Sequence, residues 1–175
     1  MHYKNTITKY GLISKIFHWL SAALLIVQIP LGFYLVDLDF GDERLKIEKI
    51  HVIIGLAIFY LIILRLLNNF FNPTPKIGPS KFLGQKLLAK TNHLLLYVAI
   101  LSITVSGILK KLFNGETLNL FFRKIALKEN FELADQFYDI HVFSNYSVVI
   151  LITIHILAVI FHKVFFNENL IKKIL

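Results

Sequence analysis

Histidines are the residues of this 175-residue chain whose type and spacing most suggest chemistry, because imidazole nitrogens bind metals and exchange protons near neutral pH. Three of them, His141, His155 and His162, lie in one long apolar segment. On a helix, His141 and His155 would lie about 40° apart around the axis and about 21 Å apart along it. His162 follows on the same face. One helical stripe could therefore serve two sites at different depths.

Apolar stretches around these histidines are long enough to cross a bilayer. The chain is 56% hydrophobic and 17% charged, and a spanning helix needs about 20 mostly apolar residues. Residues 50–67 are apolar on all sides, which argues against the amphipathic helices of a soluble bundle. We predict an all-α fold, an integral membrane four-helix bundle in a single domain over residues 1–175. The predicted helices cover approximately residues 14–36, 50–67, 89–109 and 141–166.

The segments between these helices have distinct compositions. Residues 72–79, "NPTPKIGP", form a break that ends the second helix. The stretch "NFELADQFYDIH" before the fourth helix has helical spacing and predicts an amphipathic helix that runs into it. The first apolar run is longer than the core of a signal peptide, and we expect it to stay in the protein.

The charges predict how the helices cross the membrane. The net charge of +8 is concentrated in the two termini and in the basic segment 65–90, whereas residues 37–49 are net acidic. The positive-inside rule then places both termini in the cytoplasm. In a chain this apolar, we interpret the basic residues as topology signals rather than as a nucleic-acid surface.

This topology gives each histidine a depth. His51 and His141 begin the second and fourth helices near the outer face. His18 and His93 begin the first and third helices near the inner face, where His155 and His162 also lie, and His2 is in the tail.

Two histidine levels in a membrane favour haem over other metal chemistry. Zinc and copper sites usually recruit three or four nitrogen or sulfur ligands at one depth, and a proton relay would need carboxylates that the fourth helix lacks. The chain has no Cys and a single Met at position 1, which excludes thiolate and c-type attachment. Bis-histidine b-type haem remains. Depth alone pairs His51 with His141 but leaves the inner ligands open.

The sequence resembles a known family over nearly its whole length. The segments are "SKIFHWLSAALLI", "IEKIHVIIGLAIFYLIILRLL" followed by "NPTPKIGP", "NHLLLYVAILSITVSGIL" and "HVFSNYSVVILITIHILAVIFHKVFF". A helix-one His followed by Trp and the histidine spacing of the last segment are its most specific features. Together these segments resemble the bacterial cytochrome b561 family.

The resemblance implies a multi-pass protein of the bacterial inner membrane whose four helices hold two b-type haems. It implies His51 with His141 as axial ligands of the outer haem and His18 with His155 for the inner haem. It leaves His93 and His162 as candidates for contacts with a quinone or a haem propionate, or as ordinary interfacial residues. Arg65 is a candidate for a propionate contact or an ordinary helix-end anchor.

The resemblance also implies an enzyme that oxidises superoxide and passes electrons to ubiquinone. An anionic substrate favours a basic outer surface, and the acidic first loop departs from that expectation. The basic residues available are Arg44, Lys46, Lys49, Lys110, Lys111, Arg123, Lys124 and Lys128.

Two alternatives remain. The chain could be a haem-carrying membrane subunit that relays electrons between quinone and a hydrogenase- or dehydrogenase-type partner. The least favoured alternative is a metal or proton transporter that uses the same histidines.

Overall fold

The computed structural model describes residues 2–75, 80–120 and 123–175. In these ranges the chain forms four long helices, a short β-hairpin and a final helical turn. The elements are α1 (Leu12–Asp37), α2 (Asp42–Phe71), α3 (Gln85–Phe113), β1 (Leu118–Asn119), β2 (Lys124–Ile125), α4 (Phe131–Phe166) and α5 (Ile171–Ile174).

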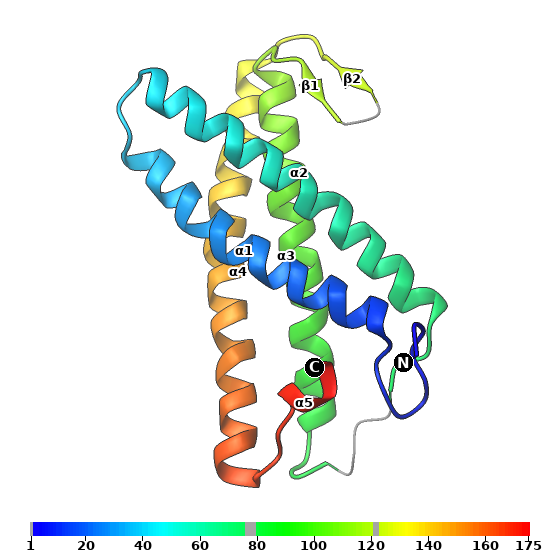
Figure 1. The fold of residues 1–175 in the computed structure, drawn as a ribbon. Coiled ribbons are helices and arrows are strands. Elements are labelled where there is room, and N and C mark those ends of the chain that lie inside the picture. The colour runs from blue at the N-terminus through cyan, green and yellow to red at the C-terminus, as the bar shows by residue number, and fades with distance from the viewer. Residues whose placement is uncertain (1, 76–79, 121–122) are drawn as a thin grey trace.

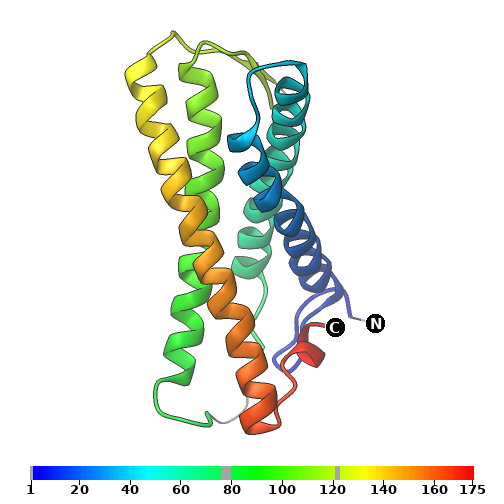
Figure 2. The same ribbon diagram turned by 90° about the vertical axis from the view of Figure 1, so that its left-hand side faces the viewer.

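The long helices form two antiparallel pairs that cross each other. In Figure 1, α1 and α2 run diagonally across the upright pair of α3 and α4, and Figure 2 shows the two pairs side by side. The α1–α2 connection and the β-hairpin lie at the same end of the bundle, which we call the hairpin end. Both termini lie at the opposite end, which we call the terminal end.

Each helix extends beyond the apolar span that the sequence predicts. The difference is largest for α2, which begins at Asp42 instead of about residue 50, and for α4, which begins at Phe131 instead of residue 141. The polar first turns of both helices need no bilayer, because intrahelical hydrogen bonds form equally well outside it. The side chain of Asn130 accepts a hydrogen bond from the Leu133 backbone N–H and caps α4.

The amphipathic segment before the fourth span is therefore the first part of α4 itself. The predicted break after the second span begins at Asn72, directly after α2 ends. Residues 76–79 of that break lie outside the described residues.

A β-hairpin connects α3 to α4, and the sequence analysis did not predict it. Its strands pair antiparallel, with Leu118 opposite Ile125 and Asn119 opposite Lys124. Leu118 is buried, and the Tyr60 hydroxyl donates a hydrogen bond to the Leu120 carbonyl. The hairpin is thereby attached to α2.

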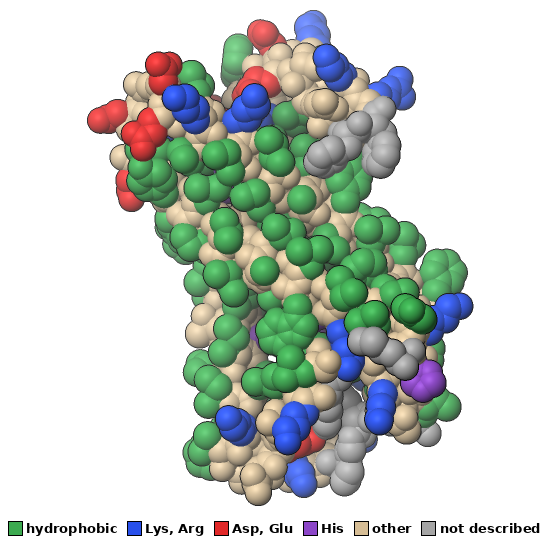
Figure 3. Space-filling model, in the orientation of Figure 1, with side chains coloured by type: hydrophobic (Ala, Val, Ile, Leu, Met, Phe, Trp, Pro, Cys, Tyr) green, Lys and Arg blue, Asp and Glu red, His purple; other side chains and the backbone are tan. Residues whose placement is uncertain are grey.

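The helix surfaces are those of a membrane protein. Large apolar side chains such as Ile26, Phe143 and Val164 are more than half exposed, at 72%, 75% and 67%. Figure 3 shows an apolar band across the middle of the visible face, with charged side chains gathered at the two ends. Among the described residues, four helices are long and apolar enough to cross a membrane, as the sequence predicted. A soluble protein rarely exposes so much contiguous apolar surface.

A small core holds the two helix pairs together near the middle of the bundle. All four long helices contribute to it, so the crossing point is fixed by interlocking aliphatic side chains. Its buried members are Leu25, Ile58, Ile62, Ala99, Ile100 and Val148.

Candidate functional site

The structure brings His51 and His141 together at the hairpin end. Their ring centroids are 6.2 Å apart, with His51 on α2 and His141 on α4. Both rings line a cavity of about 530 Å³ that all four long helices enclose. Cavities that bury cofactors usually have about 300–1,000 Å³ and a mostly apolar lining. We call this pair and its cavity the hairpin-end site.

A glycine positions His141. The His141 Nδ1–H donates to the backbone carbonyl of Ile103 at 2.7 Å, which leaves Nε2 as the nitrogen with a free lone pair. Gly107 lies one helical turn after Ile103, and a Cβ at that position would lie 3.0 Å from both Cε1 and Nδ1 of His141. Because Gly107 has no side chain, the imidazole can reach this carbonyl.

At His51 the hydrogen bond involves the backbone carbonyl of the histidine and not its ring. Gln28 Nε2 donates to the His51 carbonyl at 3.0 Å, and Gly55, one turn after His51, would place a Cβ 3.4 Å from that nitrogen. A Cβ on Gly32 would lie 3.2 Å from His51 Cε1. Gly32 on α1 and Gly107 on α3 therefore make room for the two imidazoles, and Gly55 on α2 makes room for the Gln28 amide.

Two polar atoms of this site have unmet hydrogen-bonding capacity. Gln28 Oε1 and His51 Nδ1 are buried and have no hydrogen-bond partner within the described part of the chain. Buried polar atoms normally have partners, because leaving one unpaired costs about 1–3 kcal/mol. Their presence beside a cavity is typical of a site that binds a group from outside the chain.

The cavity is charged where it reaches the hairpin end. Lys111 forms ion pairs with Glu48 at 2.8 Å and with Glu116 at 2.5 Å, and its side chain is only 12% exposed. Arg44 donates to the Leu38 carbonyl, and Lys110 lies over the Tyr138 ring. Of the basic residues predicted to form a patch, Arg44, Lys110 and Lys111 line the cavity.

A second group of histidines lies at the terminal end. The His155 ring on α4 is 6.4 Å from the His18 ring on α1 and 5.2 Å from the His93 ring on α3. Arg65 donates from Nη2 to His18 Nδ1 at 2.9 Å and also lies 5.5 Å from the Tyr97 ring. We call His18, His155 and their neighbours the terminal-end site.

His162 is held by other partners. It is buried at 7% exposure, its Nδ1 lies 3.1 Å from Glu168 Oε2, and its Nε2 lies 3.4 Å from Gln85 Nε2. The Lys81 backbone N–H fixes the orientation of the Gln85 amide by donating to its Oε1. His162 thus ties the start of α3 and the C-terminal segment to α4. Its predicted contact with a quinone or propionate stays a prediction.

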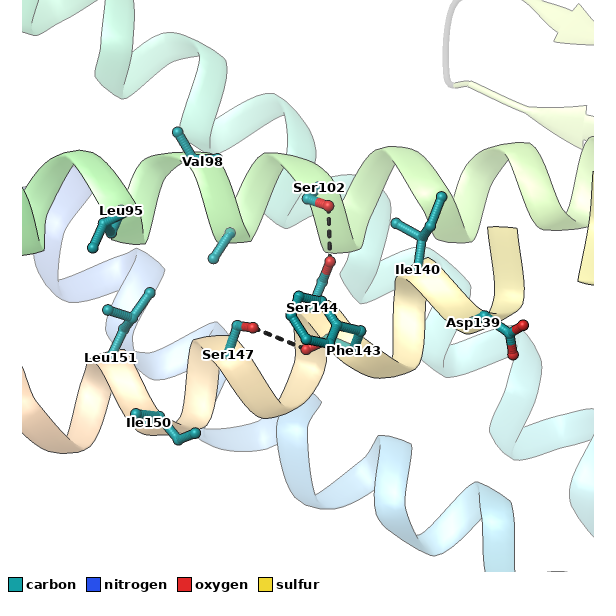
Figure 4. Close-up of a pocket in the computed structure, with 11 residues that line it drawn as sticks. Leu95, Val98, Ser102, Asp139, Ile140, Phe143, Ser144, Ser147, Ile150 and Leu151 are labelled. Atoms are coloured by element: carbon teal, nitrogen blue, oxygen red, sulfur yellow. Dashed lines mark hydrogen bonds between the residues drawn. The ribbon is translucent and has the colours of Figure 1, made fainter. Parts of the chain in front are cut away.

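A second hollow lies on the outer face of α3 and α4. It has a volume of about 670 Å³ and is lined mainly by aliphatic residues. Figure 4 shows Ser102 and Ser144 hydrogen-bonded across the two helices, at 2.8 Å, with Asp139 toward one end. None of the histidines lines it, so it is separate from both histidine sites.

The spacing of the two histidine pairs suits a metal ion whose remaining ligands come from outside the chain. Within the described ranges, no group of three or more His, Asp or Glu side chains is arranged to hold a metal ion. Imidazole nitrogens bind first-row metals at roughly 2.0–2.1 Å, so two rings on opposite sides of one metal would have centroids about 6.3 Å apart. The separations of 6.2 and 6.4 Å match this value. A macrocycle that supplies the remaining ligands, such as haem, fits both pairs.

Comparison with known proteins identifies the family of the chain. The family model described as prokaryotic cytochrome b561 matches residues 9–175. The chain belongs to the prokaryotic cytochrome b561 family. The family is one of haem-based transmembrane electron transfer, and with four membrane-spanning helices the chain is a multi-pass bacterial membrane protein.

Two curated relatives cover nearly the whole chain. Cytochrome b561 homolog 2 of Escherichia coli (strain K12) is 30% identical over 179 residues, which covers 100% of this chain and 95% of the relative. The probable superoxide oxidase CybB of Yersinia pestis is 25% identical over 172 residues, covering 95% and 96%. Both alignments of this b561 chain therefore cover at least 95% of each sequence.

Sequence reasoning missed the glycines of the hairpin-end site. Gly32, Gly55 and Gly107 each interrupt an apolar helix, and an isolated helical glycine usually has a packing or functional reason. Counting residues along the helices would have placed Gly32 and Gly107 at the depth of His51 and His141. This count could have identified the two glycines as candidates. It could not show which way each glycine faces, because that depends on helix packing.

Proposed function

We propose that this b561 protein carries electrons across the membrane through two b-type haems, each held by two histidines. His51 and His141 would hold one, and His18 and His155 the other. The observation that carries the proposal is the equal spacing of the two ring pairs at opposite ends of the bundle, 6.2 and 6.4 Å. Haem, when bound, supplies the one-electron redox chemistry that amino-acid side chains lack.

The ring distances favour His18 over His93 as the partner of His155. The His93 ring is 5.2 Å from the His155 ring, closer than two imidazoles on opposite sides of one metal can be. His93 is also exposed, and its Nδ1 lies 2.7 Å from the Ala89 carbonyl of its own helix. An Nδ1–H bond to that carbonyl leaves Nε2 as an acceptor, which suits a quinol hydroxyl.

The two sites are linked through α4, which carries one ligand of each. His141 and His155 lie about 21 Å apart along this helix. The protein between them is the aliphatic core, which excludes water and ions from the path. The chain thereby separates two redox sites by roughly two thirds of the hydrocarbon layer, which is about 30 Å thick.

We further propose superoxide as the electron donor and ubiquinone as the acceptor. Two superoxide anions would each lose one electron and become dioxygen, and one quinone would take both electrons and two protons to become quinol. The relative named a probable superoxide oxidase supports this reaction. Arg44 and Lys110 at the cavity would attract an anion, although Lys111 is already neutralised by Glu48 and Glu116.

The proposed orientation places the terminal end in the cytoplasm. This end carries the lysines of both termini, and the positive-inside rule supports the assignment. The hairpin-end site would then face the periplasm, where superoxide would reach it.

Haem stoichiometry tests the proposal. Protein purified from haem-supplied cells is expected to hold two haems per chain, and His51→Ala and His18→Ala variants one each. A colourless wild-type protein would overturn the proposal. Superoxide-dependent quinone reduction by the isolated chain tests the reaction, and a co-purifying redox subunit in its place would favour the electron-relay alternative.

A further inference from the structure

The contact between Arg65 and His18 determines which nitrogen of His18 carries its proton. Arg65 Nη2 lies 2.9 Å from His18 Nδ1. A guanidinium has only donors, so Nδ1 must accept this hydrogen bond. A neutral imidazole that accepts at Nδ1 carries its proton on Nε2. The contact therefore fixes the Nε2–H form of His18.

This form is the opposite of the one found at the hairpin-end site. His141 donates from Nδ1 to the Ile103 carbonyl and keeps the Nε2 lone pair free. For His18, binding a metal through Nε2 would require the proton to move to Nδ1, and Nδ1 would then repel the Arg65 donor. Arg65 and a metal at Nε2 therefore compete for His18.

Arg65 also lacks an anion. Besides His18 it contacts the Tyr97 ring, and among the described residues it forms no ion pair with a carboxylate within 4.0 Å. The sequence explains this, because residues 1–36 and 49–115 contain no Asp or Glu. At the terminal end, Glu168 pairs with His162. A partly buried guanidinium that is not paired with a carboxylate can bind one from outside the chain.

We propose that Arg65 controls loading of the terminal-end site by exchanging His18 for a carboxylate of the incoming haem. This inference rests on the proposed function. When Arg65 moves to the carboxylate, the His18 proton moves from Nε2 to Nδ1 and the net charge of the imidazole is unchanged. The anion would thus release the ligand that the metal needs. The hairpin-end site has no such requirement, because His141 already has the binding tautomer.

The test compares haem with haem dimethyl ester, which has the same ring and iron but no free carboxylate. Both are titrated into the His51→Ala variant, in which only the terminal-end site is intact, and binding is followed by absorbance. We expect the ester to bind about tenfold more weakly than haem, the size of effect for one hydrogen bond to a charged group. Adding Arg65→Met should remove this difference, because the ester then no longer has to displace a competitor.

Controls separate the role of charge from a general loss of structure. Arg65→Lys keeps a cation and should keep the preference for haem. Arg123→Met, in the exposed hairpin, should leave both affinities unchanged. In the His18→Ala background, which has only the hairpin-end site, Arg65→Met should not alter the ratio of haem to ester affinity.

The outcomes distinguish this inference from the proposed function. If the His51→Ala variant binds one haem but its preference for haem over the ester persists in Arg65→Met, the exchange is overturned while the two-haem proposal stands. An equal affinity for haem and ester in the His51→Ala variant with Arg65 present would also overturn it. If His51→Ala and His18→Ala each leave the haem content unchanged, the proposed function itself fails.

Discussion

The hairpin-end and terminal-end sites contain ring pairs with similar spacing, but different interactions position the rings. At the hairpin end, missing side chains at Gly32 and Gly107 make room for the imidazoles, and a neutral backbone carbonyl orients His141. At the terminal end, the Arg65 guanidinium contacts His18 directly, and His93 adds a third ring beside His155. The hairpin-end site is thus preorganised by shape, whereas the terminal-end site is governed by charge.

Pairwise removal of histidines is the strongest test of two separate sites. Under the proposed function, the double variant His51→Ala with His141→Ala should lose one haem, no more than either single variant, because both residues would serve the same iron. His51→Ala with His155→Ala should lose both haems. Haem-to-protein ratios measured on purified protein check this. Loss of both haems from the first double variant would mean that the two sites depend on each other.

Filling the space at Gly107 should damage only the hairpin-end site. In Gly107→Ala, the new Cβ would lie 3.0 Å from the His141 ring, so the ring must shift by a few tenths of an ångström, which would strain its hydrogen bond to the Ile103 carbonyl. We expect haem affinity to fall about tenfold, consistent with a modest overpacking cost, in a titration of the His18→Ala background. Gly41→Ala is the matched control, because its Cβ would meet nothing within 4 Å. An unchanged haem affinity in Gly107→Ala would show that the space at Gly107 does not position His141 for haem binding.

The charged rim of the hairpin-end site should matter for stability more than for haem content. Lys111→Met leaves Glu48 and Glu116 without their shared partner. Because both carboxylates are partly exposed, we expect a loss of about 1 kcal/mol, seen as a melting temperature lower by about 3 °C. Lys128→Met, in the exposed segment before α4, serves as the control. A fall in haem number with an unchanged melting temperature would instead make Lys111 part of the binding site.

The smallest effect is expected at the C-terminal segment. Glu168→Gln removes the carboxylate beside His162, and the segment is otherwise tied to α1 by the bond from Trp19 Nε1 to the Ile174 carbonyl. Trypsin should cut after Lys172 severalfold faster, because local opening becomes easier, while the haem content stays constant. Glu132→Gln, in the first turn of α4, provides the comparison. Loss of haem in Glu168→Gln would connect His162 to the terminal-end site.

Much of the fold could be predicted because it depends on local properties. Four apolar spans and the family follow from hydropathy, spacing and short motifs, and the structure and the family comparison confirm both. The helix ends could not be placed as well, because polar first turns such as that of Asp42 continue a helix without any hydropathy signal. The β-hairpin was missed because each of its strands has only two residues.

The sequence by itself determined which histidines share a level, since helical rise and the order of the spans fix depth. It assigned His51 and His141 to one level and left several candidates at the other. Only the tertiary structure decided that Arg65 contacts His18, that His162 is occupied by Glu168 and Gln85, and that glycines face the hairpin-end imidazoles. The reason is that the depth of a residue follows from its position along its own helix, whereas a contact between residues 18 and 65 depends on how two helices rotate and cross.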